Sequence, residues 1–252
     1  SADGSLEAVK EIRSIAGEQC FVSGMSSVVE DIKDLTMQEA PMYVVIAVIL
    51  TSIILALTMD SFLIPLFFML SVGMAIIYNM GTNFIQGEIS FITEALAAVL
   101  QLAVTIDYSI FHSYKEEKEK HPGDNKEAMA VAIGKTITSV VSSSITTVAG
   151  FLALCFMSYE LGMDMGIVMA KGVVIGVICC ITVLPSMILV FDKALEKTMH
   201  KDLVPSLEKP SKFIIKHHAA FIVLFIVVLI PAVYGQINTN VYYNLTDTLP
   251  KD

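Results

Sequence analysis

Four polar side chains fall inside long apolar stretches of the sequence, where a charge or an amide is energetically costly. Glu94, Gln101 and Asp107 share one such stretch, and Lys171 lies in another. An ionisable group within a membrane-spanning helix is rare and by default indicates an ion pathway, a proton relay or a buried ion pair. These four residues are therefore the first candidates for chemistry in this chain.

Asp107 has the surroundings that a proton site needs. It lies roughly 9 Å from the end of its predicted helix, at about 1.5 Å per residue, and Tyr108 follows it directly. At a similar depth the next apolar stretch is rich in hydroxyl groups, and Ser143 and Thr146 lie on one helical face there. A carboxyl group beside hydroxyls finds hydrogen-bond partners whether it is protonated or ionised, so Asp107 could bind and release a proton reversibly.

Each of these residues also has a plainer interpretation. Ser143 and Thr146 could serve only close helix packing, because small hydroxyl residues let helices approach one another. Asp107 could reach the membrane surface from the end of its helix, and Tyr108 could be one of the aromatic residues that gather at membrane interfaces.

Glu94 and Lys171 lie at similar depths from the opposite surface, roughly 8 and 12 Å by the same helical rise. Two interpretations stay open. They could form an ion pair within the membrane, or they could belong to a separate polar pathway together with Gln101, which shares a helical face with Glu94. Asp107 points well away from Glu94 at roughly 100° per residue, so a pair between Asp107 and Lys171 would need a large register offset.

The composition surrounding these candidates is that of a membrane protein. The chain has 252 residues, of which 55% are hydrophobic and 16% are charged, and its mean hydropathy is +0.70; soluble domains carry about 25% charged residues. The net charge of −9 argues against nucleic-acid binding, which needs a basic face. The four cysteines lack metal-ligand spacing, and no metal-protease, phosphate-loop or nucleophile-elbow motif occurs. The sequence therefore predicts no metal, no cofactor and no enzyme.

Six stretches are long and apolar enough to cross a bilayer, which takes about 20 residues each. They are residues 42–59, 61–82, 89–113, 136–157, 163–191 and 219–236. We expect an all-α polytopic membrane protein in which the first five stretches form one bundle over residues 42–191. Small residues at four-residue spacing in the fifth stretch predict close helix packing. They are Gly162, Gly166 and Ala170, followed by Gly172 and Gly176.

Lysine placement orients the predicted helices. The loop 114–135 holds five lysines and the segment 192–218 holds six, so the positive-inside rule predicts that both are cytoplasmic and that both chain ends are extracytoplasmic, in a multi-pass protein of the plasma membrane. Residues 192–218 alternate charged and apolar side chains, which favours an amphipathic helix at the membrane surface; a plain solvated linker is the alternative.

The two ends of the chain are expected to be fragments of extracytoplasmic domains. Residues 1–41 predict helix, short strand and helix, the last piece of an α/β domain, and residues 237–252 would begin a second such domain. An N-terminus outside the cell requires translocation, yet nothing before Met42 resembles a signal peptide. We therefore expect a hydrophobic segment upstream, so that this chain is a piece of a larger protein.

Two motifs carry a family resemblance. Residues 103–111, AVTIDYSIF, resemble the GxxxDY pattern of the fourth transmembrane helix in the resistance–nodulation–division (RND) superfamily, specifically its MMPL-type branch. Residues 144–154, SITTVAGFLAL, resemble the Ser/Thr-rich fifth helix of that family, which ends in AGF. Ala103 stands where the family pattern usually has glycine. The resemblance covers nearly the whole chain and implies that the six stretches are helices two to seven of a twelve-helix protein.

The resemblance also implies a function. It predicts a transporter that uses the proton-motive force to export lipids or other hydrophobic molecules, with protons as the coupling ion. Asp107 and Tyr108 would be relay residues, and Ser143 and Thr146 would support them with hydroxyl groups. The partners would be membrane lipids, a hydrophobic substrate and the second half of the same protein. Proteins with sterol-sensing domains use the same five-helix unit, so a sterol- or lipid-sensing module without pumping is the alternative.

Overall fold

The computed structural model describes residues 2–16, 22, 24–85, 87, 89–104, 109–158, 160–199 and 208–239. It divides into two compact units, one formed by residues 30–202 and the other by residues 1–29 with 203–252. In the described ranges the secondary structure is helical, apart from an isolated bridge between Ser61 and Met199. The all-α prediction is confirmed, whereas the strand predicted near residues 20–23 lies mostly outside the described residues.

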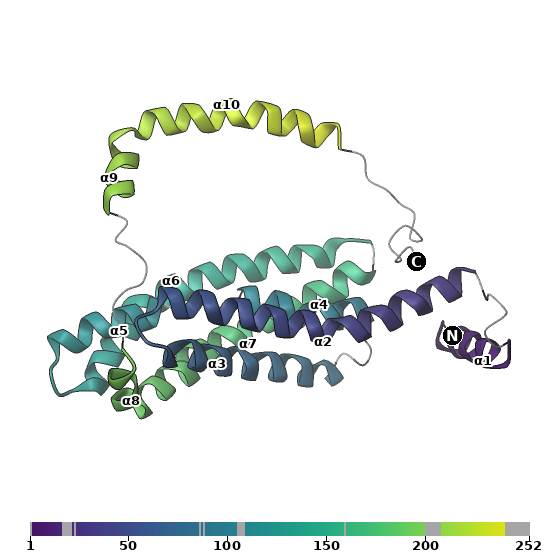
Figure 1. Ribbon diagram of the computed structural model, residues 1–252, viewed down its shortest axis with the longest axis horizontal. Coiled ribbons are helices and arrows are strands. Elements are labelled where there is room, and N and C mark those ends of the chain that lie inside the picture. Colours follow the sequence, from purple (N-terminus) through teal and green to yellow (C-terminus); the bar gives the residue numbers. More distant parts are fainter. Residues whose placement is uncertain are drawn as a thin grey trace. The chain divides into compact units, whose positions relative to one another are not determined.

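The larger unit is a helical bundle. Its helices are α2 (Met25–Thr58, which begins in the smaller unit), α3 (Leu63–Gly81), α4 (Phe91–Val104), α5 (Ser109–Lys120), α6 (Asn125–Ala153), α7 (Glu160–Val190) and α8 (Asp192–Lys197). Two short 3-10 turns, η1 (Thr82–Ile85) and η2 (Leu154–Phe156), follow α3 and α6. Helix α7 packs against α3, α4 and α6, and α5 packs against α6, as Figure 1 shows.

Six helical segments in the described chain are long and apolar enough to span a membrane. They are Met25–Thr58, Leu63–Ile85, Phe91–Lys120, Asn125–Phe156, Leu161–Val190 and His218–Ile237. The chain is thus a multi-pass membrane protein, and each predicted stretch lies within or largely overlaps one of these segments. Helix α2 runs through Pro41 without interruption, so one continuous helix joins the end of the predicted N-terminal fragment to the first span.

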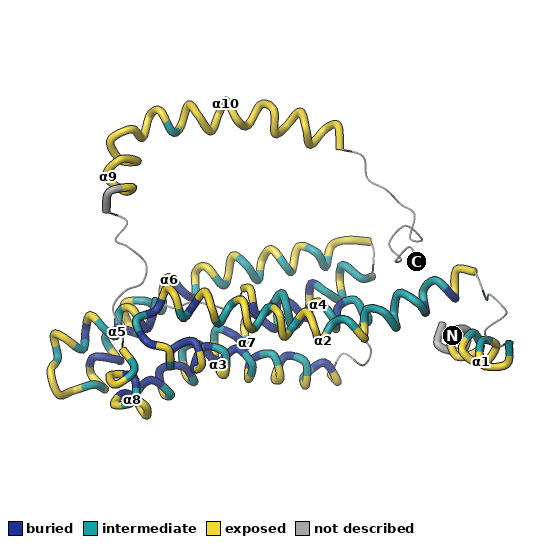
Figure 2. Tube along the Cα trace, viewed as in Figure 1, coloured by how far each residue is buried: buried dark blue, intermediate teal, exposed yellow. Residues whose placement is uncertain are grey.

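The core of the bundle lies between α3, α5, α6 and α7. Buried side chains from all four helices meet there, including Phe68, Ile110, Met129 and Leu184, and Figure 2 shows the buried residues along α3 and α7. Glycines let α7 approach α6 closely, as predicted: a Cβ added at Gly166 would lie 2.7 Å from the Phe151 carbonyl oxygen.

The smaller unit contains α1 (Ala2–Ala16), α9 (Glu208–Lys216) and α10 (His218–Ile237). The guanidinium of Arg13 in α1 donates a hydrogen bond to the Ser27 hydroxyl, which in turn donates to the Val22 carbonyl at 2.8 Å. Helix α10 is apolar on all sides, and none of its residues is buried within the protein. Apart from His218, Tyr234 and Gln236 near its two ends, α10 exposes apolar side chains, which suits a lipid environment.

Candidate functional site

The predicted relay pair, Asp107 and Tyr108, lies outside the described residues. The described chain stops at Val104, the end of α4, and resumes at Ser109, the start of α5. Both helices belong to the candidate span Phe91–Lys120. In the sequence the pair therefore lies between α4 and α5, and the structure describes the contacts that hold these two helices in the bundle.

The two supporting hydroxyls, Ser143 and Thr146, lie on the exposed side of α6. Each donates a hydrogen bond within its own helix: Ser143 Oγ to the Val140 carbonyl at 3.0 Å, and Thr146 Oγ1 to the Ser142 carbonyl at 3.1 Å. A hydroxyl that donates to its own backbone keeps free acceptor capacity. On this face of α6 the two hydroxyl oxygens can therefore accept hydrogen bonds from a neighbouring group.

Helix α4 is anchored inside the bundle by a chain of amides. The Gln101 Nε2 donates to the Gly172 carbonyl oxygen at 3.1 Å, and the Asn79 Nδ2 donates to the Gln101 Oε1 at 2.9 Å. Gln101 and Asn79 are 1% and 0% exposed. These bonds join α3, α4 and α7 at one level, where water is excluded and a broken hydrogen bond is costly.

Gly172 makes this arrangement possible because it has no side chain. A Cβ at this position would lie 2.6 Å from the Asn79 Nδ2 and 3.0 Å from the Gln101 Oε1. Any larger residue would occupy the space that the two amides fill. Gly172 therefore acts in packing, as its spacing predicts, and also exposes a carbonyl oxygen to a polar partner.

Lys171 lies beside this amide chain and is half-buried. Its ammonium group donates a hydrogen bond to the Asn83 side-chain oxygen in η1. Glu94 lies exposed on α4, and the ion pairs between described residues do not join it to Lys171. Because Gln101 is level with Gly172, Glu94 lies seven residues, or about 10 Å, farther toward the start of α4.

Two contacts between α4 and α7 show where this separation departs from the depths expected from the sequence. The Ser90 backbone N–H, just before α4, donates to the Asp164 carboxylate at 2.8 Å. Ser90 and Asp164 each lie one residue inside the predicted stretches that begin at residues 89 and 163, so this contact has the register expected from the sequence. From there to the Gln101–Gly172 contact α4 advances eleven residues and α7 only eight. Counting depth from the end of each span assumes that both helices advance equally.

Sequence reasoning missed Asn79 and Asn83, the partners of Gln101 and Lys171. They lie four residues apart at the end of the second predicted stretch, where asparagine is common in turns. Two amides on one helical face, opposite a helix that carries glycine next to lysine, are the signal that could have found them.

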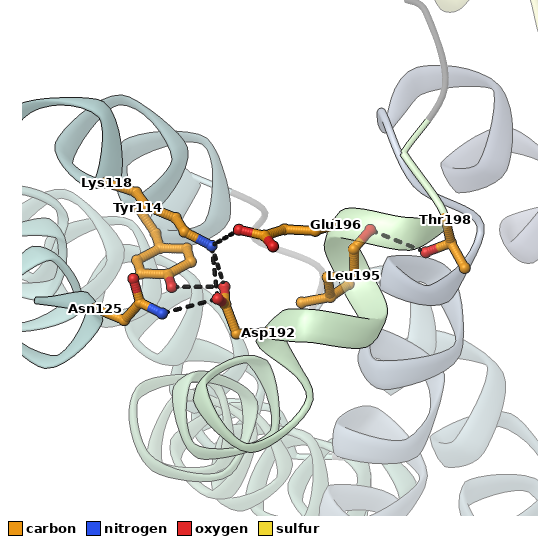
Figure 3. Close-up of polar contacts among 7 residues, drawn as sticks. All are labelled: Tyr114, Lys118, Asn125, Asp192, Leu195, Glu196 and Thr198. Carbon is orange, nitrogen blue, oxygen red and sulfur yellow. Dashed lines mark hydrogen bonds and ion pairs between the residues drawn. The ribbon is translucent and has the colours of Figure 1, made fainter. Parts of the chain in front are cut away.

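A second polar cluster, drawn in Figure 3, anchors α5. The carboxylate of Asp192, at the start of α8, accepts hydrogen bonds from the Tyr114 hydroxyl at 2.8 Å, from Lys118 Nζ at 2.6 Å and from Asn125 Nδ2 at 2.8 Å. Lys118 also pairs with Glu196 at 2.8 Å. Asp192 is 7% exposed, so these bonds join α5, α6 and α8 in a setting that water screens little.

Further contacts extend this cluster to neighbouring helices. Lys115 of α5 pairs with Asp60, and the Ser61 hydroxyl lies 2.6 Å from that of Thr198. Glu117 pairs with Lys135 of α6 at 2.7 Å. The helix that follows the Asp107–Tyr108 pair is thus held to the turn between α2 and α3, to α6 and to α8.

In the described ranges no group of three or more His, Cys, Asp or Glu side chains is placed to hold a metal ion. The groups that the structure brings together in the membrane are amides, a backbone carbonyl and one lysine. Glu94, Ser143 and Thr146 lie apart from them on exposed faces.

Comparison with known proteins identifies relatives over most of the chain. The model of the MMPL family matches residues 1–209. ActII-3 of Streptomyces coelicolor is 26% identical over 204 residues, which cover 76% of this chain and 29% of ActII-3. Membrane protein YdfJ of Bacillus subtilis is 23% identical over 248 residues, 93% of this chain and 34% of YdfJ.

A third relative carries a functional name. "Probable transport protein MmpL9" of Mycobacterium tuberculosis is 25% identical over 198 residues, 74% of this chain and 20% of MmpL9. The chain thus spans about a third or less of the length of these three relatives.

Proposed function

The chain belongs to the MMPL family, and from this premise we propose that it is part of a membrane transporter that uses the proton-motive force to export lipids or other hydrophobic molecules. The name of the relative MmpL9 supports transport. The observation that carries the proton coupling is the Asp107–Tyr108 pair within the apolar span Phe91–Lys120. An ionisable side chain is costly within a membrane span and is therefore rare there except at functional sites.

In the proposed mechanism Asp107 alternates between a neutral and an ionised form. Tyr108 and the α6 hydroxyls of Ser143 and Thr146 stabilise the ionised form by donating hydrogen bonds to it, for which each α6 hydroxyl rotates away from the carbonyl of its own helix. The neutral form needs fewer hydrogen-bond donors and lets the helices repack. One charge that crosses a potential of 100 mV supplies about 2.3 kcal/mol. That is comparable to the cost of breaking one or two interhelical hydrogen bonds in a membrane.

Of the two interpretations of Glu94, Gln101 and Lys171, we propose the polar pathway. The support is geometric: Gln101 and Lys171 have amide and carbonyl partners at one level of the bundle, and Glu94 lies about 10 Å away along α4. Such a pathway runs from Glu94 along α4 to the buried amides and the Lys171 ammonium group, and it does not require Glu94 and Lys171 to be in direct contact.

We propose that the protein lies in the plasma membrane with the lysine-rich segments 114–135 and 192–218 in the cytoplasm and both ends of this chain outside. Membrane lipids and a hydrophobic substrate would be its ligands, with protons as the coupling ion. The second half of the full-length protein would complete the relay.

Replacing Asp107 with asparagine in the full-length protein tests the relay. The side chain keeps its shape but cannot ionise, so transfer of a fluorescent phospholipid between leaflets of proteoliposomes with an imposed pH gradient should fall to the level of protein-free vesicles. Glu119→Gln, which neutralises an exposed acid on α5, is the matched control and should leave transfer unchanged.

Undiminished gradient-driven transfer by the Asp107→Asn protein would refute the relay. Lipid binding without any gradient-dependent transfer in the unmodified protein would instead support the sensing module without pumping.

A further inference from the structure

Helix α9 is held at the surface of the membrane by the helix that follows it. A single residue, His217, separates Lys216, the last residue of α9, from α10. Helix α10 is 20 residues long and apolar enough to cross a bilayer, so its first residues lie near one membrane surface. The nine residues of α9 therefore lie within reach of lipid headgroups, whatever the placement of the other unit.

One side of α9 is apolar and continues into α10. Phe213, Ile214 and Ile215 are 58%, 50% and 68% exposed. The Phe213 ring lies 4.8 Å from the His217 ring and 6.1 Å from the Phe221 ring, edge-on to the latter. These rings, with Ala220 and Leu224, line one shallow groove. An apolar surface of this kind at a membrane boundary favours contact with acyl chains.

The other side of α9 is basic. Lys212 and Lys216 lie four residues apart and so share one helical face, roughly opposite Ile214 at about 100° per residue. Residues 208–218 contain three lysines and one glutamate, together with His217 and His218. A lysine beside an apolar face extends its ammonium group toward the headgroup layer while its methylene groups cover apolar surface.

We infer that α9 and the first turn of α10 form a binding surface for anionic phospholipids, with Lys212 and Lys216 on the headgroup phosphates and Phe213 and Ile214 among the acyl chains. Charge complementarity selects anionic over zwitterionic lipid, because each lysine near an anionic surface contributes a separate electrostatic attraction. This inference does not rest on proton coupling or on transport. It concerns the lipid that surrounds the protein, not the substrate that it moves.

A single tryptophan reports the lipid next to α9. The sequence contains no tryptophan, so Phe213→Trp in this chain introduces a unique fluorophore that keeps an aromatic ring. The chain is reconstituted into phosphatidylcholine vesicles that contain, at equal mole fraction, either brominated phosphatidylglycerol or brominated phosphatidylcholine. Quenching by the anionic lipid should exceed quenching by the zwitterionic lipid, and the excess should vanish near 1 M salt, where the Debye length is about 3 Å.

Charge variants test the two lysines. Lys212→Gln with Lys216→Gln should lower the local enrichment of anionic lipid by about fivefold for each lysine removed, and Lys212→Arg with Lys216→Arg should preserve it. Lys193→Gln with Lys197→Gln is the matched control. These lysines on α8 are also exposed and four residues apart, and their loss changes the net charge equally but should leave the enrichment at position 213 unchanged.

Three results would overturn the inference. Equal quenching by both lipids would show that the surface does not select charge. Quenching by neither lipid would show that α9 is covered by protein. An enrichment that survives the double glutamine variant, or that falls equally in the α8 control, would show that Lys212 and Lys216 are not the cause.

Discussion

Replacing Gly172 with alanine should destabilise the bundle through one pair of amides. The added Cβ would lie 2.6 Å from the Asn79 Nδ2, so the Asn79 side chain must move and its 2.9 Å bond to Gln101 is lost. An interhelical hydrogen bond in a membrane contributes up to about 1.7 kcal/mol, and overpacking adds about 1–3 kcal/mol. Alanine regains about 1 kcal/mol of helix propensity. The net loss in unfolding free energy is therefore about 2 kcal/mol.

The assay is unfolding of the chain in detergent micelles, with Gly73→Ala as the matched control. Gly73 lies within α3, and a Cβ there would meet nothing within 4 Å, so this variant should be neutral or slightly stabilising. Removing Asn79 supplies a second test. In an Asn79→Ala background the 2.6 Å contact disappears and only the 3.0 Å approach to Gln101 Oε1 remains. The cost of Gly172→Ala should therefore fall by at least about 1 kcal/mol, since contacting residues couple in a double-mutant cycle.

Two results would refute this reasoning. The first is a Gly172→Ala variant as stable as the Gly73→Ala variant, which would mean that the amides do not fill the space beside Gly172. The second is an equal cost of Gly172→Ala with and without the Asn79 side chain, which would place the strain elsewhere.

Two further predictions concern the polar side chains of α8 and α6. Asp192→Asn should lower the unfolding free energy by about 2 kcal/mol in the same assay, because Lys118 loses a charge-assisted bond in a poorly solvated place; stability equal to the unmodified chain would show that the cluster in Figure 3 is not a structural anchor. Ser143→Ala and Thr146→Val should each change it by less than about 0.5 kcal/mol, because both hydroxyls are exposed and donate to their own helix. A larger loss would place them in an interhelical contact.

The six spans could be predicted from the sequence because hydropathy is a local property. The length and hydropathy of a run such as residues 42–59 are enough to predict a membrane span, whatever the rest of the chain contains. The glycine spacing of α7 is also a local signal of close packing, since small residues on one face allow any neighbouring helix to approach closely. Close packing at Gly166 was predicted in this way, although the sequence did not indicate that Phe151 would be the residue it contacts.

The polar contacts could not be predicted in the same way because they depend on register. The sequence places Lys171 and Glu94 at similar depths, and the Ser90–Asp164 bond keeps that register at the start of α4. At the Gln101–Gly172 contact, however, α4 has advanced three residues more than α7, or about 5 Å along the axis. The partner of Lys171 is Asn83, which lies just past the end of the predicted stretch 61–82. Asp192 was likewise predicted only as one charge of an amphipathic segment.

The two anchors of the span Phe91–Lys120 both end on one continuous part of the chain. Gln101 of α4 bonds to Gly172 within α7, and Tyr114 of α5 bonds to Asp192, two residues after α7 ends. Asp107 and Tyr108 lie between these anchors in the sequence.

If protonation of Asp107 repacks the helices, the span must either move together with α7 as one body or break one anchor. Breaking the buried amide contact at Gly172 costs up to about 1.7 kcal/mol, within the 2.3 kcal/mol that one charge supplies per 100 mV. Breaking the charged cluster at Asp192 removes several bonds at once and costs more. The Gln101–Gly172 contact is therefore the anchor that proton coupling would release first.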